Sequence, residues 1–134
     1  MKESAIETVM LVDDNDTDNF IHKRVIELTG FAKNIIVKNS GKSALEFLGN
    51  NKNNISALPD IIFLDINMPI VDGFVFLFEY ENFPEELKKK CKIVILSSSD
   101  SKRDIDRIVD NEYVINFITK PLSEEALEDL KKIL

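Results

Sequence analysis

The stretch Ile61-Ile62-Phe63-Leu64-Asp65 decides the fold, because four apolar residues run without interruption into a single carboxylate. Continuous hydrophobicity over so short a segment is typical of a parallel strand that is buried on both faces. An unpaired carboxylate directly after such a strand would lie close to the core, where its burial is costly. We therefore expect a buried strand at 61–64 and a functional role for Asp65.

Outward from this strand, further apolar runs alternate with segments of helical periodicity along the whole chain. Strands are predicted at 9–12, 34–38, 93–96 and 114–118, and helices at 16–29, 40–48, 74–80, 102–111 and 124–134. Residues 84–90 are interpreted as a further helical piece or as a continuation of the helix at 74–80. This alternation predicts one doubly wound, flavodoxin-like α/β domain, in which a five-stranded parallel sheet is covered by five helices.

The first predicted helix, at 16–29, carries several local signals. Asp16 or Thr17 is expected to cap its start, and Gly30 stands where a left-handed residue commonly ends a helix. Its apolar positions are Phe20, Ile21, Val25 and Leu28. His22, the single histidine, is expected to be a surface residue of this helix. In the next helix, Leu45, Phe47 and Leu48 are expected to face inward.

The composition excludes several classes of function. A chain of 134 residues fits one domain, and its formal charge of −7 disfavours direct binding of nucleic acid or an anionic membrane. The basic run 88–92 has no interleaved aromatic residues and is interpreted as a solvated helix end. A lone cysteine, Cys91, cannot form an intrachain disulfide, and no apolar run approaches the roughly 20 residues of a membrane helix. We expect a cytoplasmic protein without membrane insertion.

Polar residues follow the predicted strands at the points where they end. We assume the strand order 2-1-3-4-5, which is taken from known doubly wound proteins. In such sheets, ligands bind beyond the carboxyl ends of strands one and three. Those two strands deliver three acids. The residues that follow strands one, three, four and five are Asp13-Asp14, Asp65, Ser97-Ser98 and Thr119-Lys120-Pro121 respectively.

Three carboxylates that converge on one crevice repel each other unless a cation lies among them. Oxygen ligands without a nearby histidine favour Mg²⁺ (or Mn²⁺) over zinc or copper. Mg²⁺ uses one or two carboxylates and leaves room for phosphate oxygens. The other interpretations are a capping turn for Asp13-Asp14 and a structural salt bridge for Lys120.

At this point the sequence resembles the receiver domain of two-component response regulators, from Val9 to Leu134. The motifs that carry the resemblance are Val-Met-Leu-Val-Asp13-Asp14, Ile-Ile-Phe-Leu-Asp65-Ile-Asn-Met-Pro69-Ile-Val-Asp72-Gly73, Ile-Val-Ile-Leu-Ser97-Ser98 and Phe117-Ile-Thr-Lys120-Pro121. Each motif is weak alone, but four of them stand in the right order at the right strand ends. The resemblance implies a stand-alone receiver domain over residues 1–134, without an output domain.

The resemblance also implies a role for each matching residue. Asp65 corresponds to the aspartate that accepts a phosphoryl group from a phosphohistidine, and Lys120 to the cation that pairs with a phosphoryl oxygen. Mg²⁺ would be held by Asp13, Asp14, Asp65 and the backbone carbonyl of Asn67. Ser97 corresponds to the switch hydroxyl and Phe117 to the aromatic switch residue, and the Lys120–Pro121 bond would be cis. Ser97 replaces the commoner threonine, Ser98 a smaller residue, and Phe117 a frequent tyrosine.

The implied function is a phosphorylation switch of the face formed by helix four, strand five and helix five. The implied partners are a sensor histidine kinase or a histidine phosphotransfer protein, and a downstream protein target. Two alternatives stay open within the fold: a phosphorelay intermediate, and a scaffold that works without phosphorylation. The rival enzyme, a phosphatase of the haloacid-dehalogenase type, would need an acid where Asn67 stands. We therefore expect a signalling domain rather than an enzyme.

Overall fold

The computed structural model describes residues 6–98 and 102–134. Its five strands form one parallel sheet in the order β2-β1-β3-β4-β5, which confirms the predicted fold class and strand order. The strands are β1 Ile6–Val12, β2 Ala32–Lys38, β3 Ile61–Leu64, β4 Lys92–Ser97 and β5 Val114–Thr119. The helices are α1 Asp16–Thr29, α2 Gly41–Asn50, α3 Gly73–Tyr80, α4 Glu85–Lys90, α5 Lys102–Val109 and α6 Glu124–Lys132, with a 3₁₀ turn at Ile55–Ala57.

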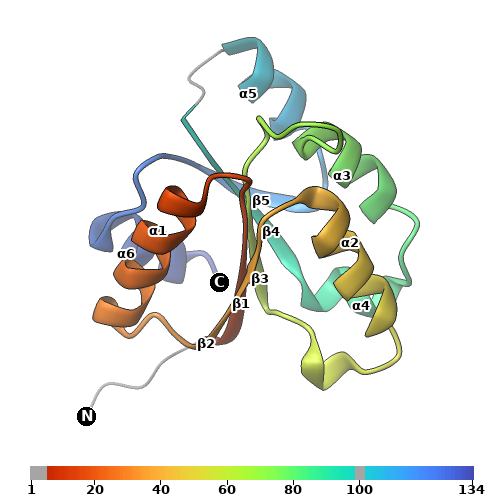
Figure 1. Ribbon diagram of the computed structural model, residues 1–134, viewed down its shortest axis with the longest axis horizontal. Helices are drawn as coiled ribbons and strands as arrows, with labels where there is room; N and C mark the ends of the chain where they lie inside the picture. Colours follow the sequence, from red (N-terminus) through yellow and green to blue (C-terminus); the bar gives the residue numbers. More distant parts are fainter. Residues whose placement is uncertain (1–5, 99–101) are drawn as a thin grey trace.

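Helices cover both faces of the sheet, with α1 and α6 on one side and α2, α3 and α4 on the other (Figure 1). Successive strand residues point to opposite faces, so each strand contributes to two hydrophobic cores. In β1, Val9 and Leu11 pack in the core under α1 and α6, whereas Met10 and Val12 pack in the core on the opposite face. This double burial explains why the strands are apolar without alternation.

The described residues contain six α-helices where the sequence predicted five. The segment 84–90 is a separate helix, α4, because the chain leaves the helical conformation after α3. Pro84 has ψ of 150° and precedes the first helical residue of α4. The fourth and fifth helices implied by the resemblance are therefore α5 and α6.

The bounds of α1 agree with the prediction, but its N-cap and its buried face do not. The Asn15 side chain, rather than Asp16 or Thr17, accepts a hydrogen bond from the Asp18 amide at 2.9 Å. Gly30 adopts the predicted left-handed conformation, with φ of 66°.

The face of α1 that meets the sheet carries Asn19, His22 and Ile26. Phe20 and Leu28, which the apolar spacing suggested for the core, are 66% and 74% exposed. His22 is only 3% exposed, so its prediction as a surface residue is wrong. Two polar residues occupy the buried face because the start of α1 borders a polar crevice at the end of the sheet. In α2, Leu48 is fully buried, and Leu45 and Phe47 pack against the same core.

Candidate functional site

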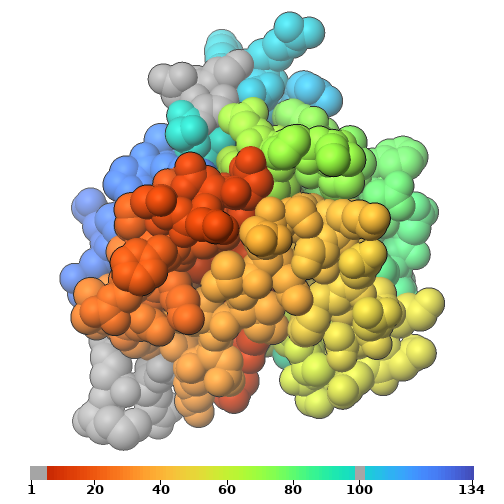
Figure 2. Space-filling model, viewed as in Figure 1, coloured from red at the N-terminus to blue at the C-terminus, as the bar shows by residue number. Residues whose placement is uncertain are grey.

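Three carboxylates gather at the end of the sheet. Asp13 and Asp14 follow β1, and Asp65 follows the neighbouring strand β3. One carboxylate oxygen of each residue lies within 4.8 Å of the others. Asp13 and Asp65 are buried, while Asp14 is exposed and gives the cluster a side open to solvent. In Figure 2 the start of α1 lies beside the loop that follows β3.

Backbone hydrogen bonds fix two of these acids in place. The Asp13 amide donates to the Lys38 carbonyl at 3.1 Å, and the Asp65 amide donates to the Val12 carbonyl at 3.0 Å. The Asp13 carboxylate accepts from the Asn15 amide at 2.9 Å. The sheet pairing therefore continues one residue beyond each strand, and it delivers both acids to the same crevice.

The Lys120 ammonium, which arrives from the end of β5, joins the acids. Its Nζ lies 2.6 Å from Asp13 Oδ2, 2.8 Å from Asp18 Oδ2 and 3.9 Å from Asp65 Oδ2. The Lys120 amide donates to the Ser97 carbonyl at 2.9 Å, which ties β5 to the end of β4. The Lys120–Pro121 peptide bond is cis, as the resemblance implies. The structure thus brings together residues 13, 14, 65 and 120.

Of the other residues named from the sequence, Ser97 and Asn67 contact Asp65 directly, whereas Phe117 lines a separate hollow. The Ser97 side chain is fully buried and hydrogen-bonds Asp65. The Asn67 amide donates to Asp65 Oδ1 at 3.4 Å. Phe117 is half-buried on β5, and it lines a surface hollow with Ile108 and Val109 of α5. Ser98 is exposed, and the segment 99–101 that follows it lies outside the described residues.

Burial raises the pKa of Asp65 to about 6, and the neighbouring charge of Asp13 adds to this effect. Lys120 opposes the rise, as do hydrogen bonds from the Asn67 amide and the Ser97 side chain. Burial alone would lower the pKa of Lys120, but its hydrogen bonds with Asp13 and Asp18 outweigh that effect, and the pKa is raised. Lys120 is thus a fixed cation beside an acid that resists ionisation.

Burial also lowers the pKa of His22, and the charge of Lys120 acts in the same direction. A neutral imidazole is therefore favoured on the buried face of α1. The nearby acids Asp18 and Asp13 oppose this shift without reversing it.

The donor set fits a hard divalent cation. Asp13, Asp14 and Asp65 offer only oxygen atoms, in the spacing a metal ion needs. Together with Asp18 the crevice holds four carboxylates, and among the described residues Lys120 is the one ammonium group paired with any of them, so the net negative charge attracts a cation. Burial is the main cause of the raised pKa of Asp65, and the charge of Asp13 adds to it, so a cation bound here would favour the ionised carboxylate.

Asp18 is the site residue that sequence reasoning missed. An acid in the first turn of a helix is ordinarily explained by the helix dipole, so nothing in the local pattern marks Asp18 as a partner of Lys120. The only feature of the sequence that could indicate this ion pair is the position of Asp18 near the start of the first helix. Asp18 lies three residues after its N-cap, on the end of α1 that borders the predicted crevice.

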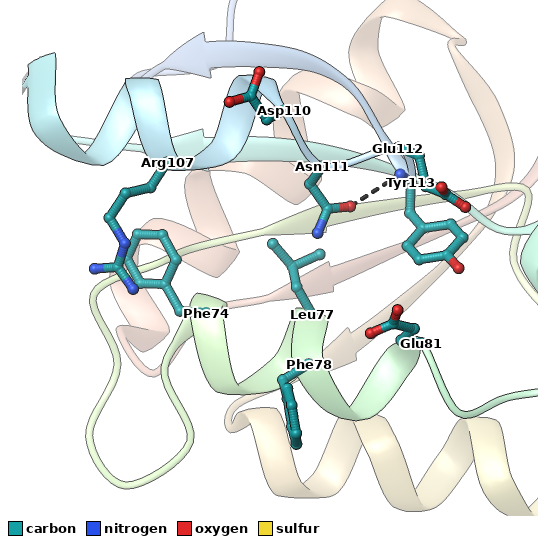
Figure 3. A pocket seen from close by; sticks show the side chains of 9 residues that line it. All are labelled: Phe74, Leu77, Phe78, Glu81, Arg107, Asp110, Asn111, Glu112 and Tyr113. Carbon is teal, nitrogen blue, oxygen red and sulfur yellow. Dashed lines mark hydrogen bonds between the residues drawn. The ribbon is translucent and has the colours of Figure 1, made fainter.

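A separate hollow of about 400 Å³ lies between α3 and α5 and does not include the clustered acids (Figure 3). The Arg107 guanidinium stacks over the Phe74 ring at 3.6 Å, and the Tyr113 amide donates to Asn111 Oδ1 at 2.9 Å. Glu81, Asp110 and Glu112 lie around its rim. Among the described residues, the acids with metal-ligand spacing are Asp13, Asp14 and Asp65, and none of them lines this hollow.

Comparison with known proteins decides the family. The model of the response regulator receiver domain matches residues 9–132, which is nearly the whole chain. The chain belongs to the response regulator receiver domain family. This confirms the resemblance drawn from the four strand-end motifs, and the protein is a receiver domain of two-component signalling.

Two response regulators or regulatory proteins are similar in sequence to this receiver domain. It is 32% identical over 124 residues to the probable methanogenesis regulatory protein FilR2 of Methanothrix harundinacea, covering 92% of this chain and 76% of FilR2. It is 29% identical over 130 residues to the response regulator Rcp1 of Synechocystis, covering 94% of this chain and 82% of Rcp1.

Solved structures extend the comparison. A two-component response regulator from Cytophaga hutchinsonii superimposes on this receiver domain with a TM-score of 0.88 and 30% identity, covering 98% of this chain and 97% of the other. The fold of Rcp1 in its Mn²⁺-bound form matches with a TM-score of 0.72 and 23% identity, covering 95% and 91% of the two chains. Within residues 6–98 and 102–134, no helix combines the length and apolar character needed to cross a membrane.

Proposed function

We propose that this receiver domain accepts a phosphoryl group on Asp65 from a phosphohistidine donor, with the help of Mg²⁺ or Mn²⁺. The observation that carries the proposal is the convergence of three acids and one ammonium group at the end of the sheet. A buried carboxylate with oxygen ligands on one side and a cation on the other matches the needs of an acceptor for a highly charged phosphoryl group.

In the transfer, a carboxylate oxygen of Asp65 attacks phosphorus and a new O–P bond forms as the N–P bond of the phosphohistidine breaks. The electron pair of the broken bond stays on the imidazole that leaves. Lys120, 3.9 Å from Asp65 Oδ2, would pair with the charge that develops on the phosphoryl oxygens. The Ser97 side chain, already hydrogen-bonded to Asp65, would donate to one of these oxygens.

The cation would be held by Asp13, Asp14 and Asp65, with the backbone carbonyl of Asn67 as a further ligand. When bound, it would supply positive charge that offsets repulsion between the acids and the phosphoryl group. The oxygen-only donor set supports this assignment, and the relative Rcp1 has been solved in a Mn²⁺-bound form.

Phosphorylation would be read out at the face formed by α5, β5 and α6. As Ser97 moves toward the phosphoryl group, Phe117 would swing inward and change the packing of this face. Phe117 is only half-buried and borders a hollow with Val109 and Val114, which gives its ring room for a second position. The partners would be a sensor histidine kinase or a histidine phosphotransfer protein, and a downstream protein target. The setting would be the cytoplasm.

The alternatives to a terminal switch are a phosphorelay intermediate and a scaffold that works without phosphorylation. The complete set of acids and Lys120 favours use of phosphorylation over the scaffold. The signalling family favours a phosphoacceptor over an enzyme that turns over small phosphate esters.

The experiment is incubation with acetyl phosphate and Mg²⁺, read by intact mass. We expect one phosphoryl adduct on the wild-type protein, and no adduct on Asp65→Asn or when EDTA removes the cation. Asp72→Asn is the matched control. Asp72 caps α3 by accepting from the Val75 amide at 2.9 Å, and asparagine caps equally well, so this variant should keep the adduct. A wild-type protein that takes no phosphoryl group would favour the scaffold.

A further inference from the structure

Asp18 makes an ion pair that the proposed phosphotransfer does not use. Its Oδ2 lies 2.8 Å from Lys120 Nζ, which is much shorter than the 3.9 Å between Lys120 and Asp65. Among the hydrogen bonds of the described residues, the Asp18 carboxylate accepts only from Lys120. It also lies outside the three acids that have metal-ligand spacing.

The position of Asp18 makes it a firm anchor. It belongs to the first turn of α1, where its own amide donates to the Asn15 side chain at 2.9 Å. The Lys120 side chain is 12% exposed and that of Asp18 is 33% exposed, so the pair is partly shielded from water. A short, charge-assisted hydrogen bond between a helix and the end of β5 therefore sets where the ammonium group lies.

Asp13 contacts Lys120 as closely as Asp18 does, but it has other partners. Its carboxylate also accepts from the Asn15 amide, and it is a candidate ligand of the cation. Among the described contacts, the Asp18 carboxylate accepts no hydrogen bond from the Asn15 amide and is not a candidate metal ligand. Asp18 can therefore keep its ion pair with Lys120 when Asp13 binds the cation.

We propose that Asp18 is a positioning residue that holds the Lys120 ammonium group on the α1 side of the crevice before phosphorylation. The ammonium group must leave Asp18, or share its hydrogen bonds, to pair with a phosphoryl oxygen on Asp65. Asp18 thus restrains phosphoryl uptake and sets its rate. This inference rests on the proposed function, because it concerns the use of Lys120 in phosphoryl transfer.

The test compares Asp18→Asn with Asp16→Asn. Both variants remove one negative charge from the first turn of α1, but Asp16 is exposed and makes no ion pair with Lys120. At saturating acetyl phosphate and Mg²⁺, Asp18→Asn should take up the phosphoryl group about 3- to 30-fold faster than wild type, the range that corresponds to losing one partly buried ion pair. The acetyl phosphate concentration for half-maximal rate should change little. Asp16→Asn should change the rate less than about twofold.

A double-mutant cycle distinguishes the ion pair between Asp18 and Lys120 from a general effect of the Asp18 charge. In a Lys120→Met background, Asp18→Asn should no longer accelerate uptake, because the group it restrains is gone. Asp18→Glu, which keeps a carboxylate at this position, should bring the rate back toward that of wild type. Equal rates for Asp18→Asn and Asp16→Asn, or full acceleration without Lys120, would overturn the inference.

A second readout does not depend on phosphorylation. The NMR signal of the Lys120 ammonium group should be protected from exchange with water in the unphosphorylated wild type, and this protection should fall in Asp18→Asn but not in Asp16→Asn. If the wild type takes no phosphoryl group, the proposed function fails while this signal still decides whether Asp18 holds Lys120. An ammonium signal that is the same in both variants contradicts the proposal that Asp18 positions Lys120.

Discussion

Replacing Asp65 by asparagine should stabilise the fold, because the site stores unfavourable charge at this residue. In the folded protein, burial raises the pKa of Asp65 from 3.8 to about 6. Ionised Asp65 therefore costs free energy of folding at neutral pH. Asparagine keeps the shape and can still accept from the Asn67 amide, but it carries no charge.

The magnitude follows from the shift. About two pKa units correspond to roughly 3 kcal/mol at most, and the open side of the crevice screens part of it, which leaves about 1–3 kcal/mol. For a domain of this size, the midpoint of thermal unfolding should rise by about 3–10 °C.

The stability gained by Asp65→Asn should depend on pH. Well below pH 3.8 Asp65 is protonated in both the folded and the unfolded chain, so wild type and Asp65→Asn should be equally stable in this respect, and by pH 4 most of the difference should be lost. Between about pH 4 and 6 wild type should lose stability relative to the variant, and above pH 6 the difference should stay constant. The assay is thermal unfolding in EDTA at pH 4 and pH 7.5.

Addition of Mg²⁺ supplies the control. The cation should stabilise wild type, in which it offsets the repulsion, more than Asp65→Asn, which lacks one of the three carboxylates. A variant that is less stable than wild type at pH 7.5 in EDTA, or a gain that is equally large at pH 4, would contradict an unfavourable charge on Asp65 in the folded protein.

Two further substitutions test the packing around the site. Gly73→Ala should destabilise the protein by about 2–4 kcal/mol in denaturant unfolding, because an added Cβ would lie 2.6 Å from the Ile66 Cα. Gly49→Ala in α2 should stabilise it by about 0.5–1 kcal/mol, because the nearest atom to an added Cβ there is 3.9 Å away. Equal effects of the two substitutions would contradict this difference in packing. Tyr80→Phe should cost about 1–2 kcal/mol in the same assay, because the buried hydroxyl donates to the Cys91 carbonyl, and an unchanged stability would contradict this role.

The sheet could be predicted from the sequence because its central strands β1, β3 and β4 are largely buried on both faces. The uninterrupted apolar runs at 61–64 and 93–96 predict buried strands, and the residues after them lie at the end of the sheet where ligands bind in this fold. Asp13, Asp65 and Lys120 were found in this way, and the structure brings their side chains together. Their roles in phosphoryl transfer, and the stand-alone organisation of the domain, stay predictions.

The helices were harder to interpret, because polar residues occupy part of a buried face. Asn19 and His22 occupy buried positions where α1 borders the crevice, so of the four apolar positions only Val25 packs against the core, and Phe20, Ile21 and Leu28 are exposed. The ion pair between Asp18 and Lys120 joins residues 102 positions apart, and no local pattern encodes such a contact. The break between α3 and α4 was left open by the sequence and depends on the extended conformation at Pro84.

The most direct test of the account is to locate the phosphoryl group. After incubation with acetyl phosphate and Mg²⁺, borohydride reduces an aspartyl phosphate to homoserine, which peptide mass spectrometry identifies by position. We expect homoserine at position 65 in wild type, none there when EDTA is present, and less of it at equal reaction time in Lys120→Met, in which the transfer is slower. Homoserine at position 13 or 14 in place of 65, or its appearance at 65 without a divalent cation, would contradict the claim that the acids and Lys120 act together on Asp65.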